Sequence, residues 1–336
     1  MLKLVNSLKY PNLIAKLKGM NAKNLNSKDF EELLKQNNIV SINSILKAKS
    51  YHLKNLDDNS SREEIENELD NILIDDIEKI EKYLSNKDKE ILFNCVLDYE
   101  IKVFMDVLKK IKYGKIEQNK IDNINKWTSK IFNKLQGIAR VNNINEIKIY
   151  SKKTAFENII NIFLDTNNIE ESNLFLLEMQ LDKFYFENLF NNLNTESSKK
   201  LIGTKIDLEN IIWIYRMKKY YNMPEEEIKK YIIEVDYNLK CLNELIAIDD
   251  YKQIIEILKK TKYKEIFETE NENLEILIRK YMYNQYKKTF RQAKYDISTI
   301  ISYLGMDKNQ IENIINIVGG VEYKIDKQKI QEKIII

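Results

Sequence analysis

Apolar residues recur along most of the chain at intervals of three and four positions, the spacing that places them on one face of an α-helix. The clearest such run contains Ile65, Leu69, Ile72, Leu73, Ile77, Ile80 and Leu84. Ser61 stands before this run and Glu64 follows three positions later, a pair that forms a capping box at a helix start. No run of alternating apolar and polar residues is long enough to predict a strand. The pattern therefore predicts an all-α protein.

One longer pattern occurs three times, at a spacing of a little over 100 residues. Its copies, from the clearest to the most divergent, occupy residues 207–220, 310–323 and 100–113. In each copy thirteen positions separate a polar first residue from a final tyrosine. Internal repeats indicate related structural units, and such proteins usually present extended binding surfaces. The pattern favours binding or assembly over catalysis.

The repeat also sets expected boundaries inside one all-helical protein, residues 1–336. A second shared spacing, a leucine followed five positions later by a tyrosine, occurs at Leu46 and at Leu258. We expect internal repeats over residues 1–117, 118–231 and 232–336.

The aromatic residues of the pattern are expected to pack inside the protein. Tyr113, Tyr220 and Tyr323 are predicted to be half-buried, each with its ring packed and its hydroxyl bonded at a helix end. Trp213 is predicted to be a core residue. None of these roles requires a substrate.

The polar residues of the pattern are expected to pair within the chain. Asn210 and Asn313 are predicted to bond a neighbouring backbone across a helix crossing. Arg216 is predicted to pair with Asp207 or Glu209, although neither stands at the best helical spacing.

Glycine and proline are scarce, with 7 and 2 residues in 336, so long uninterrupted helices are possible. Gly114, Gly203 and Gly305 are expected where helices stop or turn. Pro224, which three glutamates follow, is predicted to occupy the first position of a helix.

The formal net charge is +2, from 54 basic and 52 acidic residues, and the two signs are interspersed. This balance lacks the basic footprint of a nucleic-acid-binding protein, so no nucleic-acid partner is expected. Cys95 and Cys241 lie far apart in apolar helical patterns, which favours free thiols in a reducing compartment. No apolar run reaches the roughly 18–20 residues of a membrane span. A cytoplasmic protein is expected.

Residues for catalysis or cofactor binding are sparse. His52 is the only histidine, so a histidine-based metal site or triad is not expected. Gly203-Thr204-Lys205 lacks the order and the upstream glycine of a phosphate-binding loop. The paired aspartates in the chain are adjacent in sequence, so on a helix their side chains diverge by about 100°. We expect neither a metal nor a cofactor.

Several stretches resemble those of one known family, in both order and spacing. They are Tyr10–Met20, Leu181–Leu189, Gly203–Tyr221, Phe290-Arg291, Ile300–Leu304 and Ile311–Ile314. Together they are similar to the C-type component of bacterial and archaeal A/V-type ATP synthases, the counterpart of the d-type component of the eukaryotic V-type ATPase. The resemblance covers essentially the whole chain.

The chain also departs from that family in its charges. Family members usually carry acidic residues before the position of Ile311 and a basic residue after it. Here Lys308, Asn309 and Gln310 precede Ile311, and Glu312 follows. The first copy of the pattern has Val103 where the other two have asparagine.

The resemblance implies a funnel-shaped helical protein with three pseudo-repeats around a central axis. In the family's role it is a non-catalytic socket that joins the rotor shaft subunits, of D and F type, to the membrane c-ring of proteolipids. It would turn with the rotor and transmit torque for proton or sodium transport, without binding nucleotide. It would lie on the cytoplasmic face of the cell membrane, with one copy per rotor, so the isolated chain is expected to be monomeric.

Two other functions remain open from the residues alone. A general helical scaffold could bind soluble protein partners in a concave groove. An RNA-binding helical repeat is a further alternative, although the near-neutral charge is unfavourable for it.

Overall fold

The computed structural model describes residues 2–50, 53, 56–114, 124–125, 133–166, 174–248, 250–267 and 273–336. Within these residues the chain forms helices and connecting turns, without strands, so the fold is all-α as predicted. His52 lies outside the described residues.

The N-terminal half of the fold contains the following helices. They are α1 (Leu2–Asn21), α2 (Ser27–Leu34), α3 (Ile39–Lys49), α4 (Arg62–Glu81), α5 (Asn86–Cys95), α6 (Leu97–Tyr113), the 3-10 helices η2 (Asn133–Leu135) and η3 (Ile138–Arg140), α8 (Ile144–Ser151) and α9 (Glu157–Thr166).

The remaining helices follow in the C-terminal half. They are α10 (Leu174–Asn192), α11 (Glu196–Tyr221), α12 (Glu225–Tyr231), α13 (Leu242–Ala247), α14 (Tyr251–Leu258), α15 (Lys264–Phe267), α16 (Leu274–Gln292), α17 (Ile297–Glu322) and α18 (Lys327–Glu332).

The predicted helix after Ser61 is α4, and its start has the predicted capping box. The Ser61 side chain accepts a hydrogen bond from the Glu64 backbone N–H, and the Glu64 side chain accepts one from the Ser61 N–H. The apolar stripe of α4 packs against α17 in the core. Pro224 departs slightly from its prediction, because it is the N-cap and the first helical residue is Glu225.

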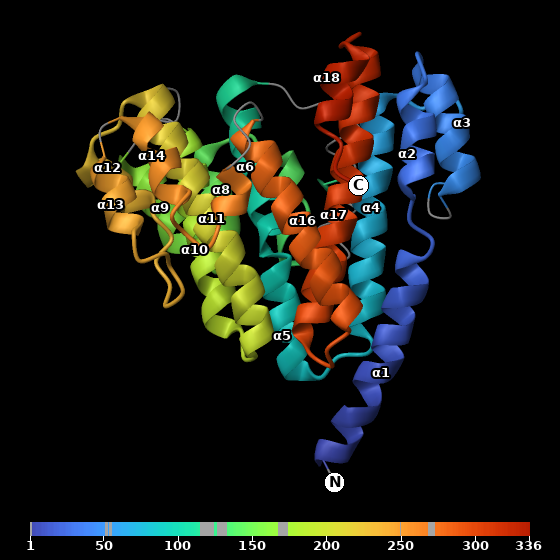
Figure 1. Cartoon of the computed structure of the whole chain (residues 1–336), viewed down its shortest axis with the longest axis horizontal. Helices are drawn as coiled ribbons and strands as arrows, with labels where there is room; N and C mark the ends of the chain where they lie inside the picture. The colour runs from blue at the N-terminus through green and yellow to red at the C-terminus, as the bar shows by residue number, and fades with distance from the viewer. Residues whose placement is uncertain are drawn as a thin grey trace.

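Two long helical hairpins dominate the centre of the molecule (Figure 1). Helices α10 and α11 form one hairpin and α16 and α17 form the other. The second turns tightly because Ala293 adopts a left-handed conformation, with φ of 46°, and the Asp296 side chain then caps α17 by accepting from the Ser298 N–H. Helices α11 and α17 contact each other, so the two hairpins form one packed body.

Helix α17 is the centre of the core. It packs against α1, α3, α4, α5, α11, α16 and α18. Between Ile297 and Gly320 most of its residues are buried, because it is apolar on more than one face. Helix α1 contacts α17 and then extends away from the body toward the N-terminus (Figure 1).

Two of the three glycines expected at helix ends lie inside helices instead. Gly203 is within α11 and Gly305 is within α17. A Cβ at Gly203 would lie 2.4 Å from the Tyr237 ring, and one at Gly305 would lie 2.6 Å from the Tyr286 ring. These glycines therefore allow aromatic rings to approach the helix backbone. Gly114 does end α6, in a left-handed conformation, as predicted.

Candidate interaction site

The first polar residue of the clearest motif, Asp207, joins α11 to two later segments. Its buried carboxylate accepts from the Leu239 backbone N–H at 2.9 Å and from the Tyr263 hydroxyl at 2.7 Å. Lys262 Nζ lies 2.9 Å from the same oxygen that Tyr263 contacts. Burial raises the pKa of Asp207, and these partners oppose that rise by stabilising the charged form.

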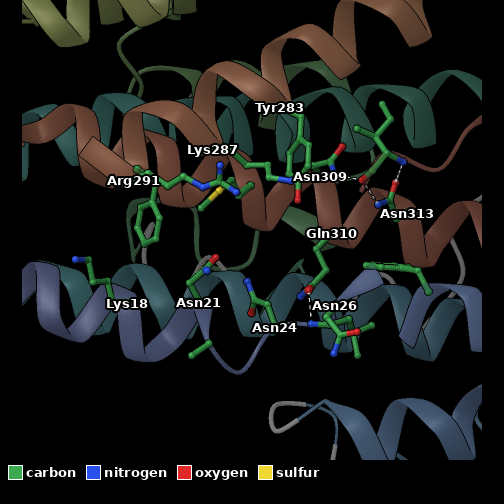
Figure 2. A pocket seen from close by; sticks show the side chains of 16 residues that line it. Lys18, Asn21, Asn24, Asn26, Tyr283, Lys287, Arg291, Asn309, Gln310 and Asn313 are labelled. Atoms are coloured by element: carbon green, nitrogen blue, oxygen red, sulfur yellow. Dashed lines mark hydrogen bonds between the residues drawn. The ribbon is translucent and has the colours of Figure 1, made fainter. Parts of the chain in front are cut away.

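Asn210 and Asn313 make the same two-way contact in different parts of the chain. The Asn210 side-chain amide donates to the Ile233 carbonyl and accepts from the Ile233 N–H, both at 2.9 Å. Asn313 donates to the Ile335 carbonyl at 2.7 Å and accepts from the Ile335 N–H at 3.1 Å. Each amide bonds a neighbouring buried backbone, as predicted for both asparagines, but that backbone lies outside a regular helix and not at a helix crossing. Figure 2 shows the Asn313 contact.

The motif copy at residues 100–113 lacks this contact, because the buried Val103 stands in place of the asparagine. Glu100, at the place of Asp207, is 2% exposed and has Lys134 Nζ 2.9 Å away. Burial raises the pKa of Glu100, and Lys134 opposes the rise. The copy at residues 100–113 thus retains a buried acid with a lysine partner, as in the copy at residues 207–220.

Arg216 does not pair with Asp207 or Glu209, contrary to prediction. Its Nη2 lies 2.6 Å from Glu275 Oε1 of α16. Asp207 is about two and a half turns earlier on α11, and Lys262 and Tyr263 already occupy its carboxylate. Arg216 therefore links the two hairpins rather than two turns of one helix. Trp213 lies in the core, 7% exposed, as predicted.

The three motif tyrosines are exposed, which contradicts the prediction that they are half-buried. Tyr113 and Tyr220 are each 65% exposed and Tyr323 is 68% exposed. Each stands where its helix ends, close to a residue in a left-handed conformation. Tyr113 directly precedes Gly114, Tyr323 directly precedes Lys324, and Tyr220 lies two positions before Asn222. The chain turns away at these points, so the rings extend beyond the packed helical turns.

A cationic side chain lies against each of these exposed rings. Lys112 is 5.4 Å from the Tyr113 ring centroid and Lys219 is 5.0 Å from that of Tyr220. The Arg62 guanidinium, from α4, is 5.4 Å from that of Tyr323. Helices α6, α11 and α17 run in the same direction, so their C-terminal ends lie at one end of the molecule (Figure 1). Each of these helix ends carries an exposed tyrosine with a basic neighbour, and we call the three tyrosines together the tyrosine face.

A cluster of charges between the hairpins was not found from the sequence. Lys308 of α17 lies 2.5 Å from Asp98 of α6. Burial, and next to it the Glu209 carboxylate, raises the pKa of Asp182 to about 7. Burial alone would lower the pKa of Lys205, but the surrounding acidic groups outweigh it and the pKa is raised. Only the packing of α6, α10, α11 and α17 brings these residues together.

The positions whose charges depart from family expectation all have partners within the chain. Lys308 pairs with Asp98, and the Gln310 side chain accepts from the Leu25 N–H at 2.8 Å. Glu312 lies 2.9 Å from Arg279 of α16. Arg279 also donates to Asn309 and Asn313. These residues therefore tie α17 to its neighbours.

The described residues contain neither a metal-binding cluster nor a membrane-spanning helix. No group of three or more histidine, cysteine, aspartate or glutamate side chains there could hold a metal ion. Among the helices of the described part, none is long and apolar enough to cross a membrane. Cys95 and Cys241 are free thiols.

Comparisons with known proteins identify similar chains. The family model described as "ATP synthase (C/AC39) subunit" matches residues 13–333. A protein of Pyrococcus furiosus, described as the C component of an A-type ATP synthase, is 22% identical over 339 residues, 96% of this chain and 89% of that protein. Proteins of Methanosarcina acetivorans and Methanocaldococcus jannaschii with the same description are 26% and 25% identical. Those two matches span 56% and 53% of the relatives' own lengths.

Proposed function

Because the chain belongs to the ATP synthase (C/AC39) subunit family and is thus a subunit of an A/V-type ATP synthase, we propose that it is the non-catalytic rotor socket of that complex. In this role it joins the central shaft, of D- and F-type subunits, to the c-ring of proteolipids. It turns with them and transmits torque between ion transport and ATP chemistry. The observation that carries the proposal is the family match over residues 13–333.

The contacts of the motif helices support a role in transmitting force. Asp207 and Asn210 fix α11 to segments that follow it, and Asn313 fixes α17 to Ile335 near the C-terminus. Arg216 and Glu275 link the two hairpins. The Asp207, Asn210 and Asn313 contacts are buried and paired, and such contacts hold packed elements in one arrangement, whereas the Arg216–Glu275 pair is exposed. Such rigidity suits a subunit that transmits torque, because a flexible body would store elastic energy instead of passing it between ion transport and ATP chemistry.

The tyrosine face is our candidate for a partner contact within the complex. Tyrosine is enriched in protein interfaces because a rigid ring and a hydroxyl offer large contact area at low entropic cost. Here the same ring recurs at the same place in three motif copies although it contributes little to the core. A contact outside the chain accounts for that recurrence.

We further propose that the three motif copies mark pseudo-repeats over residues 1–117, 118–231 and 232–336, arranged as a funnel. The shared asparagine contacts support the repeat itself, although the Asn210 contact, to Ile233, crosses the boundary at 232 while the Asn313 contact stays within one repeat. The boundary at 232 follows directly after α12, whereas residue 118 lies outside the described residues. The protein would lie on the cytoplasmic face of the membrane, bound through the c-ring.

Reconstitution of the complex with and without this chain tests the proposal. Vesicles that contain the complete complex should couple ATP hydrolysis to ion uptake. Without the chain, hydrolysis should continue while ion uptake is lost, and added purified chain should restore uptake. Coupled uptake in the absence of the chain would contradict the rotor-socket role. Exclusive co-purification with soluble proteins, and none with solubilised membrane complexes, would favour the scaffold alternative.

A further inference from the structure

A cavity of about 570 Å³ lies between the N-terminal segment and the α16–α17 hairpin (Figure 2). Helix α1 and the residues up to Asn26 form one wall, and α16 and α17 form the other. The lining contains three cationic residues, Lys18, Lys287 and Arg291, and no aspartate or glutamate among the described residues. The whole chain is almost balanced, with 54 basic and 52 acidic residues, so the lining has a local excess of positive charge. A second cavity, between α11 and α16, also carries three lysines and no carboxylate, but its volume of about 250 Å³ is below the range of small-molecule sites.

The three cations are not neutralised by carboxylates of the described chain. Lys18 and Arg291 are exposed, and neither lies within ion-pair distance of a described acidic side chain. Lys287 has its ammonium group 5.0 Å from the Tyr283 ring centroid, a contact that positions the lysine without cancelling its charge. Figure 2 shows Lys287 and Arg291 on the α16 wall, with Lys18 on the opposite helix. The cavity therefore has positive charge on both walls.

Two amide side chains in the lining are oriented by the backbone so that their NH₂ groups remain available. The Gln310 oxygen accepts from the Leu25 N–H at 2.8 Å. The Asn26 oxygen accepts from the Lys28 and Asp29 N–H groups at the start of α2. Because backbone N–H groups hold the oxygen of each amide in place, the NH₂ group is left to donate hydrogen bonds. Cations and NH₂ donors together favour an anionic ligand.

We propose that this cavity binds a small anion that bears more than one phosphate group. Its volume lies within the roughly 300–1,000 Å³ of small-molecule sites. Lysine and arginine side chains with amide donors suit phosphate oxygens, which accept several charge-assisted hydrogen bonds. A single surface cation would not select such a ligand, whereas three cations around one concave space match a charge greater than one. The site is separate from the tyrosine face, and its existence does not depend on the rotor role.

Calorimetric titration of the purified full-length chain with inorganic pyrophosphate tests the site. We expect saturable binding that weakens as salt rises from roughly 50 to 200 mM, as electrostatic screening requires. The double variant Lys287→Gln with Arg291→Gln should bind at least about tenfold more weakly, equivalent to about 1.4 kcal/mol. Neither side chain is part of the buried core, so the variant should keep the melting temperature of the wild type.

Two lysines of the smaller cavity, one on α11 and one on α16, supply a matched control. Lys200 and Lys288 line a different cavity, between α11 and α16. The variant Lys200→Gln with Lys288→Gln removes the same charge and should leave pyrophosphate binding unchanged. Equal weakening in both variants would show that pyrophosphate senses only the overall charge, and this would overturn the proposal. Absence of saturable binding in the wild type would overturn it directly.

Vesicle flotation identifies the source of the phosphate groups. One set of vesicles contains cardiolipin, whose headgroup bears two phosphates, and the other only phosphatidylcholine. Flotation with cardiolipin that pyrophosphate and the Lys287/Arg291 variant both abolish would assign the site to a lipid headgroup. Pyrophosphate binding without flotation would assign it to a soluble phosphate compound. Flotation that the control variant abolishes equally would contradict a specific site.

Discussion

The amides of Asn210 and Asn313 show how one side chain can fix a distant backbone. Removing the Asn210 amide, as Asn210→Ala, leaves the buried Ile233 N–H without a partner, while the Ile233 carbonyl keeps its hydrogen bond from the Asn238 side chain. An unpaired buried group costs about 1–3 kcal/mol. We therefore expect the free energy of unfolding to fall by about 1–3 kcal/mol, measured by chemical denaturation.

The control for that measurement is Asn192→Ala. Asn192 is exposed on α10 and contacts only Asn188 of its own helix among the described residues. Its loss should change the unfolding free energy by less than about 0.5 kcal/mol. Equal effects of the two substitutions would mean that the Ile233 contact does not stabilise the fold.

Two carboxyl groups with raised pKa values, the buried Asp307 and the half-buried Asp182, make stability depend on pH. Burial raises the pKa of Asp307 to about 7, and the nearby Asp76 carboxylate adds to the rise, while Asn24 and Lys79 oppose it. One Asp307 oxygen has no hydrogen-bond partner among the described residues. Burial, with Glu209 and Glu178, raises the pKa of Asp182 to the same value.

The sign of the pH effect follows from these raised values. An unfolded aspartate has a pKa of about 3.9, so the folded state binds the proton more tightly. This stabilisation is complete below about pH 4 and is lost as pH rises through about 7. Asp307→Asn, which stays neutral, should flatten the fall in melting temperature between about pH 4 and 8. Glu226→Gln, at a side chain that is 84% exposed, should not alter the slope.

At the residue scale, the sequence predicts buried contacts better than exposed ones. Periodicity identified Trp213 as a core residue, and amide chemistry identified the backbone contacts of Asn210 and Asn313. The prediction that the three motif tyrosines are half-buried was wrong, because a ring at the helical spacing is buried only if its helix continues past it. Left-handed residues close after these tyrosines end the helices at that point. Of those left-handed positions, Gly114 has the residue type that most clearly signals such a turn.

At the element scale, glycines inside α11 and α17 set the distance to neighbouring rings. Gly305→Ala would gain about 1 kcal/mol in helix propensity if the helix were isolated. A Cβ there would lie 2.6 Å from the Tyr286 ring, which is buried and cannot move freely. Overpacking costs about 1–3 kcal/mol, so we expect a net loss of stability and a lower melting temperature.

Gly19→Ala in α1 is the matched control, because nothing lies within 4 Å of a Cβ at that position. It should stabilise the protein by up to about 1 kcal/mol through helix propensity alone. If both alanine variants raised the melting temperature, Tyr286 would have to repack without cost. The sequence could predict α4 from its stripe and capping box, yet not this role of Gly305, because the ring comes from another helix.

At the scale of the whole molecule, several contacts join segments that are far apart in sequence. Lys308 meets Asp98 across 210 positions, and Tyr303 donates to Asp76 across 227. The sequence predicted the fold class and the family, because periodicity and the order of the motifs can be recognised along the chain without knowing how the helices pack. It could not place the charge cluster or the cavity beside α1, since each depends on how separate helices pack.

The tyrosine face gives the last prediction, at the scale of the assembled enzyme. Replacing Tyr113, Tyr220 and Tyr323 together by alanine should leave the unfolding free energy nearly unchanged, because all three rings are largely exposed. If the face binds a rotor partner, the loss of a tyrosine that acts as a hot spot removes about 2 kcal/mol or more of binding energy. Added to complexes that lack the native chain, the triple variant should restore ATP-driven ion uptake at least about tenfold less effectively per mole than wild type.

The control substitutes a tyrosine that is also exposed but lies outside the repeated motif. Tyr295, in the turn between α16 and α17, is 70% exposed and stands at the opposite end of α17 from Tyr323. Tyr295→Ala should restore uptake as the wild type does. Full restoration by the triple variant would show that the recurring tyrosines do not form the partner contact, even if the chain itself proves necessary for coupling. The rotor role and the assignment of its contact surface are thus tested separately, because the first depends on removing the chain and the second on three side chains that its fold does not need.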